Sequence, residues 1–148
     1  MRKYEIFDIS GDAGIRAWGG DLPVLFVNAA EGLFSLITDP APSGATEKRR
    51  VSAQADSAES LLVAWLNELV FHFDAYGFLA RRIRVRSFRC EGGGAEGRQD
   101  CSIVADAEGE TFDPDRHVRK LLPKAATWHK LKLEHRNDSW FAEIIIDI

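Results

Sequence analysis

The sequence predicts an α+β domain in which two amphipathic helices pack on a mainly antiparallel sheet. Apolar residues recur at helical spacing over residues 22–37 and 57–73, whereas the intervening segments alternate as strands do. Neither helix is expected to be stable alone, so each should bury its apolar face against the sheet. The chain has 148 residues, 45% hydrophobic and 28% charged, which fits a single domain over residues 1–148.

The helix ends are marked by local signals. Asp21 is suited to cap the first helix, and Pro40 should end it, leaving Asp39 at its exit. The second helix should begin near Asp56-Ser57, either of which can accept hydrogen bonds from free amides. Gly77 is its expected C-terminal cap.

Turn signals separate the expected strands. Ser10-Gly11-Asp12 marks the first turn, the glycine-rich segment 91–97 marks a hairpin tip, and Asn137-Asp138 joins the last pair. The predicted strands are residues 4–8, 15–18, 48–55, 80–91, 102–105, 125–135 and 140–148.

Composition excludes several classes of protein. The formal net charge of −4 argues against bulk electrostatic attachment to nucleic acid and leaves open a local basic patch. The longest apolar run, Leu61 to Leu66, is too short for a membrane span, and the polar start lacks a signal-peptide core, so we expect a soluble, cytoplasmic protein. Cys90 and Cys101 are expected to be free thiols flanking a turn.

Local features leave alternatives open. The stripe Arg82, Arg84, Arg86 suits RNA phosphate or an acidic protein surface, and equally the protection of an exposed strand. Trp65 is expected in the core. We expect His117 to pack in a turn and His129 to be a satisfied strand residue.

Three carboxylates stand at predicted element ends. Asp12 lies in a turn, Asp39 at a helix exit, and Asp147 one residue before Ile148. If these ends meet, the carboxylates and the Ile148 α-carboxylate would repel one another unless protonated or bridged by a cation. A hard divalent ion, Ca²⁺ or Mg²⁺, prefers such oxygen ligands. The alternative is ordinary turn, cap and chain-end roles.

The last strand favours the metal interpretation. In residues 140–148, period-two alternation puts Ile144, Ile146 and Ile148 on one face and Asp147 on the other. Ile148 would then anchor the end of the strand in the core and fix Asp147 in space.

The chain resembles the archease family, whose members assist the RtcB-type RNA ligase that seals tRNA halves. The resemblance rests on "DISGDAGIRAWG", "FVNAAEGLFSLITD", "ESLLVAWLNELVFHFDAYGF", "FDPDRH", "PKAATWHKLKLE" and "IIIDI". It implies a metal-binding acidic cluster of Asp12, Asp39, Asp147 and Ile148. Lys124, in the stretch similar to the family's "KAxTYH", is implied as part of the functional surface.

Two features depart from the family pattern. The family's first turn reads H-T-A-D, whereas this chain has Ile9 at the histidine position, and isoleucine neither titrates nor coordinates a metal. The hairpin tip GGGAEG at residues 92–97 is longer than usual for the family.

The resemblance implies a non-enzymatic activator that promotes ligase guanylylation and multiple turnover, with indirect contact to tRNA or nucleotide. Two alternatives come from other classes. One is a small metal-dependent phosphoester hydrolase. The sequence offers no recognisable nucleophile or general base beside the acidic cluster, which argues against this alternative. The other is a binding module for RNA or a modifying enzyme, carried by the arginine stripe.

Overall fold

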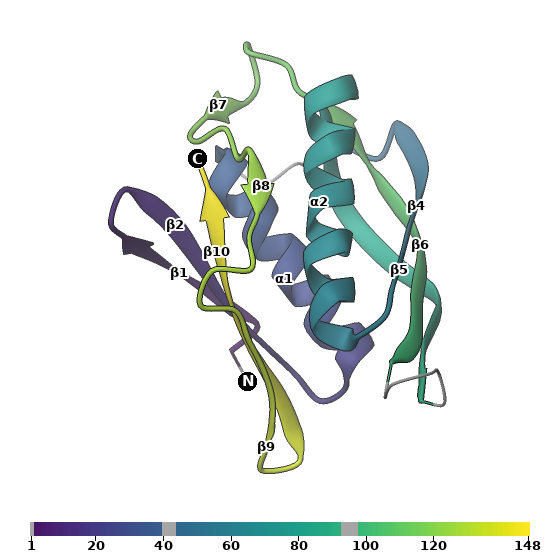
Figure 1. Ribbon diagram of the computed structural model, residues 1–148. Coiled ribbons are helices and arrows are strands. Elements are labelled where there is room, and N and C mark those ends of the chain that lie inside the picture. Colours follow the sequence, from purple (N-terminus) through teal and green to yellow (C-terminus); the bar gives the residue numbers. More distant parts are fainter. Residues whose placement is uncertain (1, 40–43, 93–97) are drawn as a thin grey trace.

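The computed structural model describes residues 2–39, 44–92 and 98–148, and its two helices lie between two sheets (Figure 1). The first sheet has the order β1-β2-β10-β8, with β9 also pairing with β10, and the second has the order β4-β6-β5. The predicted α+β class with antiparallel pairing is confirmed, with the strands divided between opposite sides of the helices.

The elements have the following bounds. The first sheet contains β1 (Tyr4–Ile9), β2 (Asp12–Gly19), β8 (Ala125–Ala126), β9 (Lys132–Arg136) and β10 (Ser139–Asp147). The second contains β4 (Glu47–Ala55), β5 (Phe78–Gly92) and β6 (Gln99–Thr111). The helices are α1 (Leu22–Ile37) and α2 (Ala58–Tyr76), and a small ladder pairs β3 (Thr38–Asp39) with β7 (Val118–Arg119).

Three predicted helix caps are described by the structure and follow the sequence signals, whereas Pro40, predicted to end the first helix, lies outside the described residues. Asp21 accepts a hydrogen bond from the Val24 N–H at 2.9 Å. Ser57, rather than its neighbour Asp56, caps α2 by accepting from the Ser60 N–H at 3.0 Å. Gly77 ends α2 with φ of 68°, a left-handed conformation that glycine adopts without a steric cost. Within the described residues, neither helix is long and apolar enough to cross a lipid bilayer.

Trp65 joins the two helices at the centre of the core, as predicted. Its side chain is fully buried, and its indole N–H donates to the Phe26 carbonyl of α1 at 3.0 Å. α1 packs on β1, β2 and β5, and α2 packs on β4, β6, β5, β8 and β9. Each helix therefore contacts both sheets.

The predicted strand at residues 125–135 is wrong as a continuous element. β8 ends at Ala126, and a turn closed by a 3.2 Å hydrogen bond from the Leu131 N–H to the Trp128 carbonyl precedes β9. Lys130 has φ of 53°, which a strand cannot contain. His129 is exposed and lies in this turn, so its predicted strand position is also wrong.

The prediction of two free thiols is wrong as well. Cys90 and Cys101 are direct cross-strand partners in the β5–β6 ladder and form a disulfide. Their separation of 11 residues gave no indication of this, because the strand register that places them opposite each other depends on the whole hairpin. The tip of the hairpin, residues 93–97, lies outside the described residues.

Candidate metal and partner site

The antiparallel register of β2 and β10 brings Asp12 and Asp147 together. The ladder ends with the pair Ala13 and Ile146, and Asp12 and Asp147 are the next residues of the two strands at this end. Ala13 and Ile146 are buried, at 1% and 0% exposure, on the face that the helices cover. Because side chains alternate along strands, both aspartates point to the outer face of the sheet.

The β1–β2 turn fixes the position of Asp12. Ser10 and Gly11 have φ of 47° and 88°, which suits a two-residue hairpin turn. Ile9 pairs with Asp12 across this turn, and Ala125 of β8 pairs with Asp147. The position of the family's histidine is therefore the cross-strand neighbour of Asp12 on the same face.

The two aspartates differ from the other carboxylates of this face in their electrostatic surroundings. Arg16 bonds Glu5 and Glu143 at 2.8 Å each, and its hydrogen bond holds the pKa of Glu5 below the usual value. In contrast, Asp12 and Asp147 form no ion pair with any residue in the described part of the chain. Two adjacent carboxylates without a paired cation favour binding of a positive ion.

The end of β10 is held in place by its neighbours. The Lys124 N–H donates to the Asp147 carbonyl at 2.7 Å, and the Thr127 N–H and hydroxyl both donate to the Ile145 carbonyl at 3.0 Å. Ile148 is half-buried and packs against the core. The Lys124 side chain is exposed beside this strand end.

Asp39 lies at the same end of the molecule but lines a separate cavity. This cavity has a volume of about 290 Å³ and also includes Thr38, Arg81 and Lys120 in its lining. The Lys120 N–H donates to the Ile37 carbonyl at 2.9 Å, so residues 120–124 connect the exit of α1 to the end of β10. The four steps of chain from Lys120 to Lys124 span at most about 14 Å. The structure therefore brings Asp12 and Asp147 together and places Asp39 nearby on another surface.

The residues fit a hard cation through a mixed donor set. In residues 2–39, 44–92 and 98–148, no group of three or more His, Cys, Asp or Glu side chains is arranged to hold a metal. Asp12 and Asp147 supply two carboxylates, and the α-carboxylate of Ile148 is the predicted third oxygen ligand from this strand end. An all-oxygen donor set suits Ca²⁺ or Mg²⁺ rather than a soft metal.

Sequence reasoning missed a buried network around Glu110, which is 3% exposed. The Asp113 N–H donates to His117 Nδ1 at 2.9 Å, which leaves the ring proton on Nε2 to donate to Glu110 Oε1 at 2.8 Å. Arg116 donates to Glu110 Oε2 at 2.7 Å. The predicted turn packing of His117 is confirmed. The "FDPDRH" motif indicated the turn around His117, but Glu110, the partner of the histidine, lies outside that motif.

Comparison with known proteins identifies the family. Residues 4–148 match the Archease protein family, and the chain belongs to it. The chain is 34% identical to the protein archease of Methanosarcina acetivorans, over 99% of this chain and 97% of that protein. It is 30% identical to the protein archease of Sulfurisphaera tokodaii over the full length of both.

Solved structures agree with this family. The solution structure of Methanobacterium thermoautotrophicum protein 1598 covers all of both chains with a TM-score of 0.76 and 31% identity. A Thermotoga maritima crystal structure, described as an archease and possible chaperone, gives a TM-score of 0.56 over 100% of this chain and 98% of that chain. At 17% identity, the second similarity shows the fold alone.

Proposed function

We propose that this archease is a cytoplasmic accessory protein that promotes guanylylation of an RtcB-type RNA ligase and so supports its multiple turnover in tRNA splicing or RNA repair. The observation that carries the proposal is the pair of unneutralised aspartates, Asp12 and Asp147, at a strand end held by the backbone of Lys124. A rigid acidic site is suited to present a cation to phosphate groups at a partner's active site.

Each residue has a proposed role. Asp12 and Asp147 would hold Ca²⁺ or Mg²⁺ together with the α-carboxylate of Ile148, and the ion would supply positive charge toward nucleotide phosphates. Lys124, exposed next to them, would pair with a phosphate or a carboxylate of the complex. Asp39 remains a predicted ligand, at the same end of the molecule.

The surroundings of the aspartates support an accessory role over that of a hydrolase. The cross-strand neighbours of the pair are Ile9 and Ala125, and the next position on the face of β2 is Gly14. None of these three described residues offers a nucleophile or a general base.

Replacing Asp147 with asparagine is expected to reduce stimulation of the ligase at least about tenfold, because a neutral amide binds a divalent cation far more weakly than a carboxylate. The measurement is a guanylylation time course of a cognate ligase with substoichiometric wild type, Asp12→Asn or Asp147→Asn protein. Calcium binding to each protein alone, measured by calorimetry, gives a second readout.

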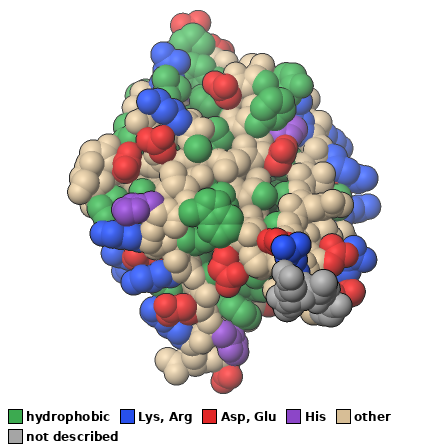
Figure 2. All heavy atoms as spheres, in the orientation of Figure 1, with side chains coloured by type: hydrophobic (Ala, Val, Ile, Leu, Met, Phe, Trp, Pro, Cys, Tyr) green, Lys and Arg blue, Asp and Glu red, His purple; other side chains and the backbone are tan. Residues whose placement is uncertain are grey.

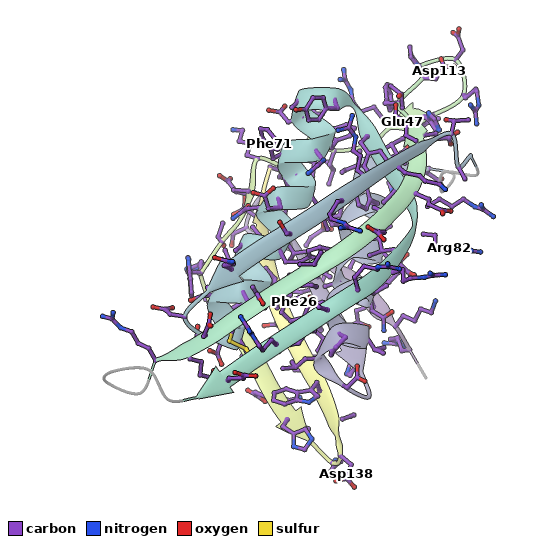
Figure 3. All side chains as sticks on the ribbon, turned by 90° about the vertical axis from the view of Figure 1, so that its right-hand side faces the viewer. Phe26, Glu47, Phe71, Arg82, Asp113 and Asp138 are labelled. Atoms are coloured by element: carbon purple, nitrogen blue, oxygen red, sulfur yellow. A yellow bond between two sulfur atoms is a disulfide. The ribbon has the colours of Figure 1, made fainter. Side chains whose placement is uncertain are left out.

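Asp138→Asn is the matched control. Asp138 lies in the β9–β10 turn at the opposite end of β10 (Figure 3), and asparagine tolerates its φ of 64°. This variant loses the same charge and should stimulate as the wild type does. A folded Asp147→Asn protein that stimulated as well as the parent would refute the proposal.

A further inference from the structure

The outer face of the β4-β6-β5 sheet carries basic side chains on its two outer strands, β4 and β5. Acidic side chains stand between them on the central strand, β6. On the central strand β6, Asp106 pairs in register with Arg50 of β4 and Arg84 of β5. Two residues further along β6, Glu108 pairs in the same way with Lys48 of β4 and Arg82 of β5. Figure 3 looks onto this face with Arg82 labelled on β5, and Figure 2 shows Lys and Arg side chains along the same edge of the molecule.

The basic rows along β4 and β5 form the sides of a shallow cleft with a volume of about 460 Å³. Neighbouring strands lie about 4.8 Å apart, so the basic rows of β4 and β5 stand roughly 10 Å apart, with successive side chains of a row about 6.7 Å apart. An extended polyanion lying along the cleft would have cationic groups on both sides. The lining residues are Lys48, Arg49, Arg50, Arg82, Arg84, Asp106, Ala107 and Glu108.

The positive charge on this face exceeds what the sheet itself neutralises. Arg50 and Arg86 both pair with Asp106, at 3.0 and 3.3 Å, and the hydrogen bond from Arg50 lowers the pKa of Asp106. Lys48, Arg82 and Arg84 form no ion pair with any residue in the described ranges. Even if Glu108 neutralised one of these three cations, two would remain for an external anion.

We infer that this face binds the phosphate backbone of a nucleic acid without reading its sequence. Guanidinium groups match phosphate geometry with paired N–H donors, and phosphate contacts position a nucleic acid without specifying its bases. Base stacking is not expected to add affinity here, because the described residues lining the cleft include no aromatic side chain.

The same face is poorly suited to a folded acidic protein. Protein interfaces place aromatic and other apolar anchors at a core from which charged residues are depleted. The only apolar residue lining this cleft in the described structure is Ala107. The large hydrophobic side chains exposed elsewhere, among them Phe71, Val118 and Trp128, lie on other elements or in the Thr127–Leu131 turn.

This inference goes beyond the proposed function and does not depend on it. Asp12 and Asp147 belong to the other sheet, with both helices between the two surfaces (Figure 1). A protein that loses one surface should therefore keep the other.

Binding of a short single-stranded RNA to the whole protein, measured by fluorescence anisotropy at several salt concentrations, tests the inference. We expect the double variant Arg82→Gln/Arg84→Gln to bind at least about tenfold more weakly at about 50 mM salt. Its log–log salt slope should be shallower by roughly 0.7 for each phosphate that the variant no longer neutralises. Ligase stimulation by this arginine variant is measured separately. It reports on the proposed function, because the variant leaves the Asp12–Asp147 site intact.

Arg2→Gln/Arg136→Gln is the control, because it removes the same charge from exposed positions on the other sheet and the N-terminal segment. It should keep wild-type affinity and slope. A polyglutamate peptide serves as a probe for acidic protein and should bind much more weakly than the RNA. Undetectable RNA binding at about 50 mM salt, equal loss in both double variants, or tighter binding of polyglutamate would each overturn the inference.

Discussion

Replacing Trp65 with alanine is expected to lower the free energy of unfolding by about 4 kcal/mol, the size typical of a buried tryptophan truncation. The side chain has no exposed surface, and it lies where α2 faces α1 between the two sheets. Its loss leaves a cavity that the surrounding backbone cannot fill, and it removes the hydrogen bond to the Phe26 carbonyl. Both effects act on the single core that the two sheets share.

Urea unfolding followed by circular dichroism measures this effect. Trp65→Phe keeps an aromatic ring and loses mainly the indole hydrogen bond, so it should cost only about 1–2 kcal/mol. Trp128→Ala is the control, since that side chain is 57% exposed and should cost less than about 0.5 kcal/mol. Equal destabilisation by Trp65→Ala and Trp128→Ala would show that Trp65 does not anchor the core.

The parts of the fold that depend on neighbouring residues were predictable. Asp21 and Gly77 act within one helical turn, and the Ser10-Gly11 turn requires only two positive φ angles. Each of these signals is read from a few consecutive residues. The helix positions and the first hairpin therefore followed from the sequence alone.

The features set by pairing between distant strands were not predictable. The Cys90–Cys101 disulfide depends on the register of a 15-residue strand with a 13-residue one. The break at Lys130 arises because β10 pairs with β8 near one end and with β9 near the other. Hydrophobic alternation does not distinguish two short edge strands from one long strand.

The candidate site was partly predictable for the same reason. Asp12 and Asp147 each stand at the end of a strong strand pattern, and the structure places those ends side by side. Asp39 is separated because α1 ends in the β3–β7 ladder, whose second strand was not predicted. Lys124 was implied only by the family resemblance, and the structure places its N–H on the Asp147 carbonyl.

Replacing Glu110 with alanine is expected to lower the free energy of unfolding by about 3 kcal/mol, because it leaves a buried donor without an acceptor. The Nε2–H of His117 loses its bond to Glu110 in a position where the histidine side chain is only 3% exposed. The ion pair with Arg116 contributes less, since that arginine is 54% exposed and water screens its charge.

The effect should also reach the candidate site. Val118 and Arg119 of β7 follow His117 directly and pair with β3, which carries Asp39. Residues 120–124 then continue to the carbonyl of Asp147. Loosening His117 is therefore expected to increase hydrogen exchange at the amides of Lys120 and Lys124 more than at buried β6 amides such as that of Ile103.

Urea unfolding and hydrogen exchange of Glu110→Ala, Glu110→Gln and Glu134→Ala separate the contributions. Glutamine keeps an acceptor for His117 while losing the charge, so Glu110→Gln should cost only about 1–2 kcal/mol. Glu134 pairs with Arg136 at the surface, and its removal should cost less than about 1 kcal/mol. If Glu110→Ala were no more costly than Glu134→Ala, or left exchange at Lys124 unchanged, the Glu110 network would not be what positions the segment that meets the end of β10.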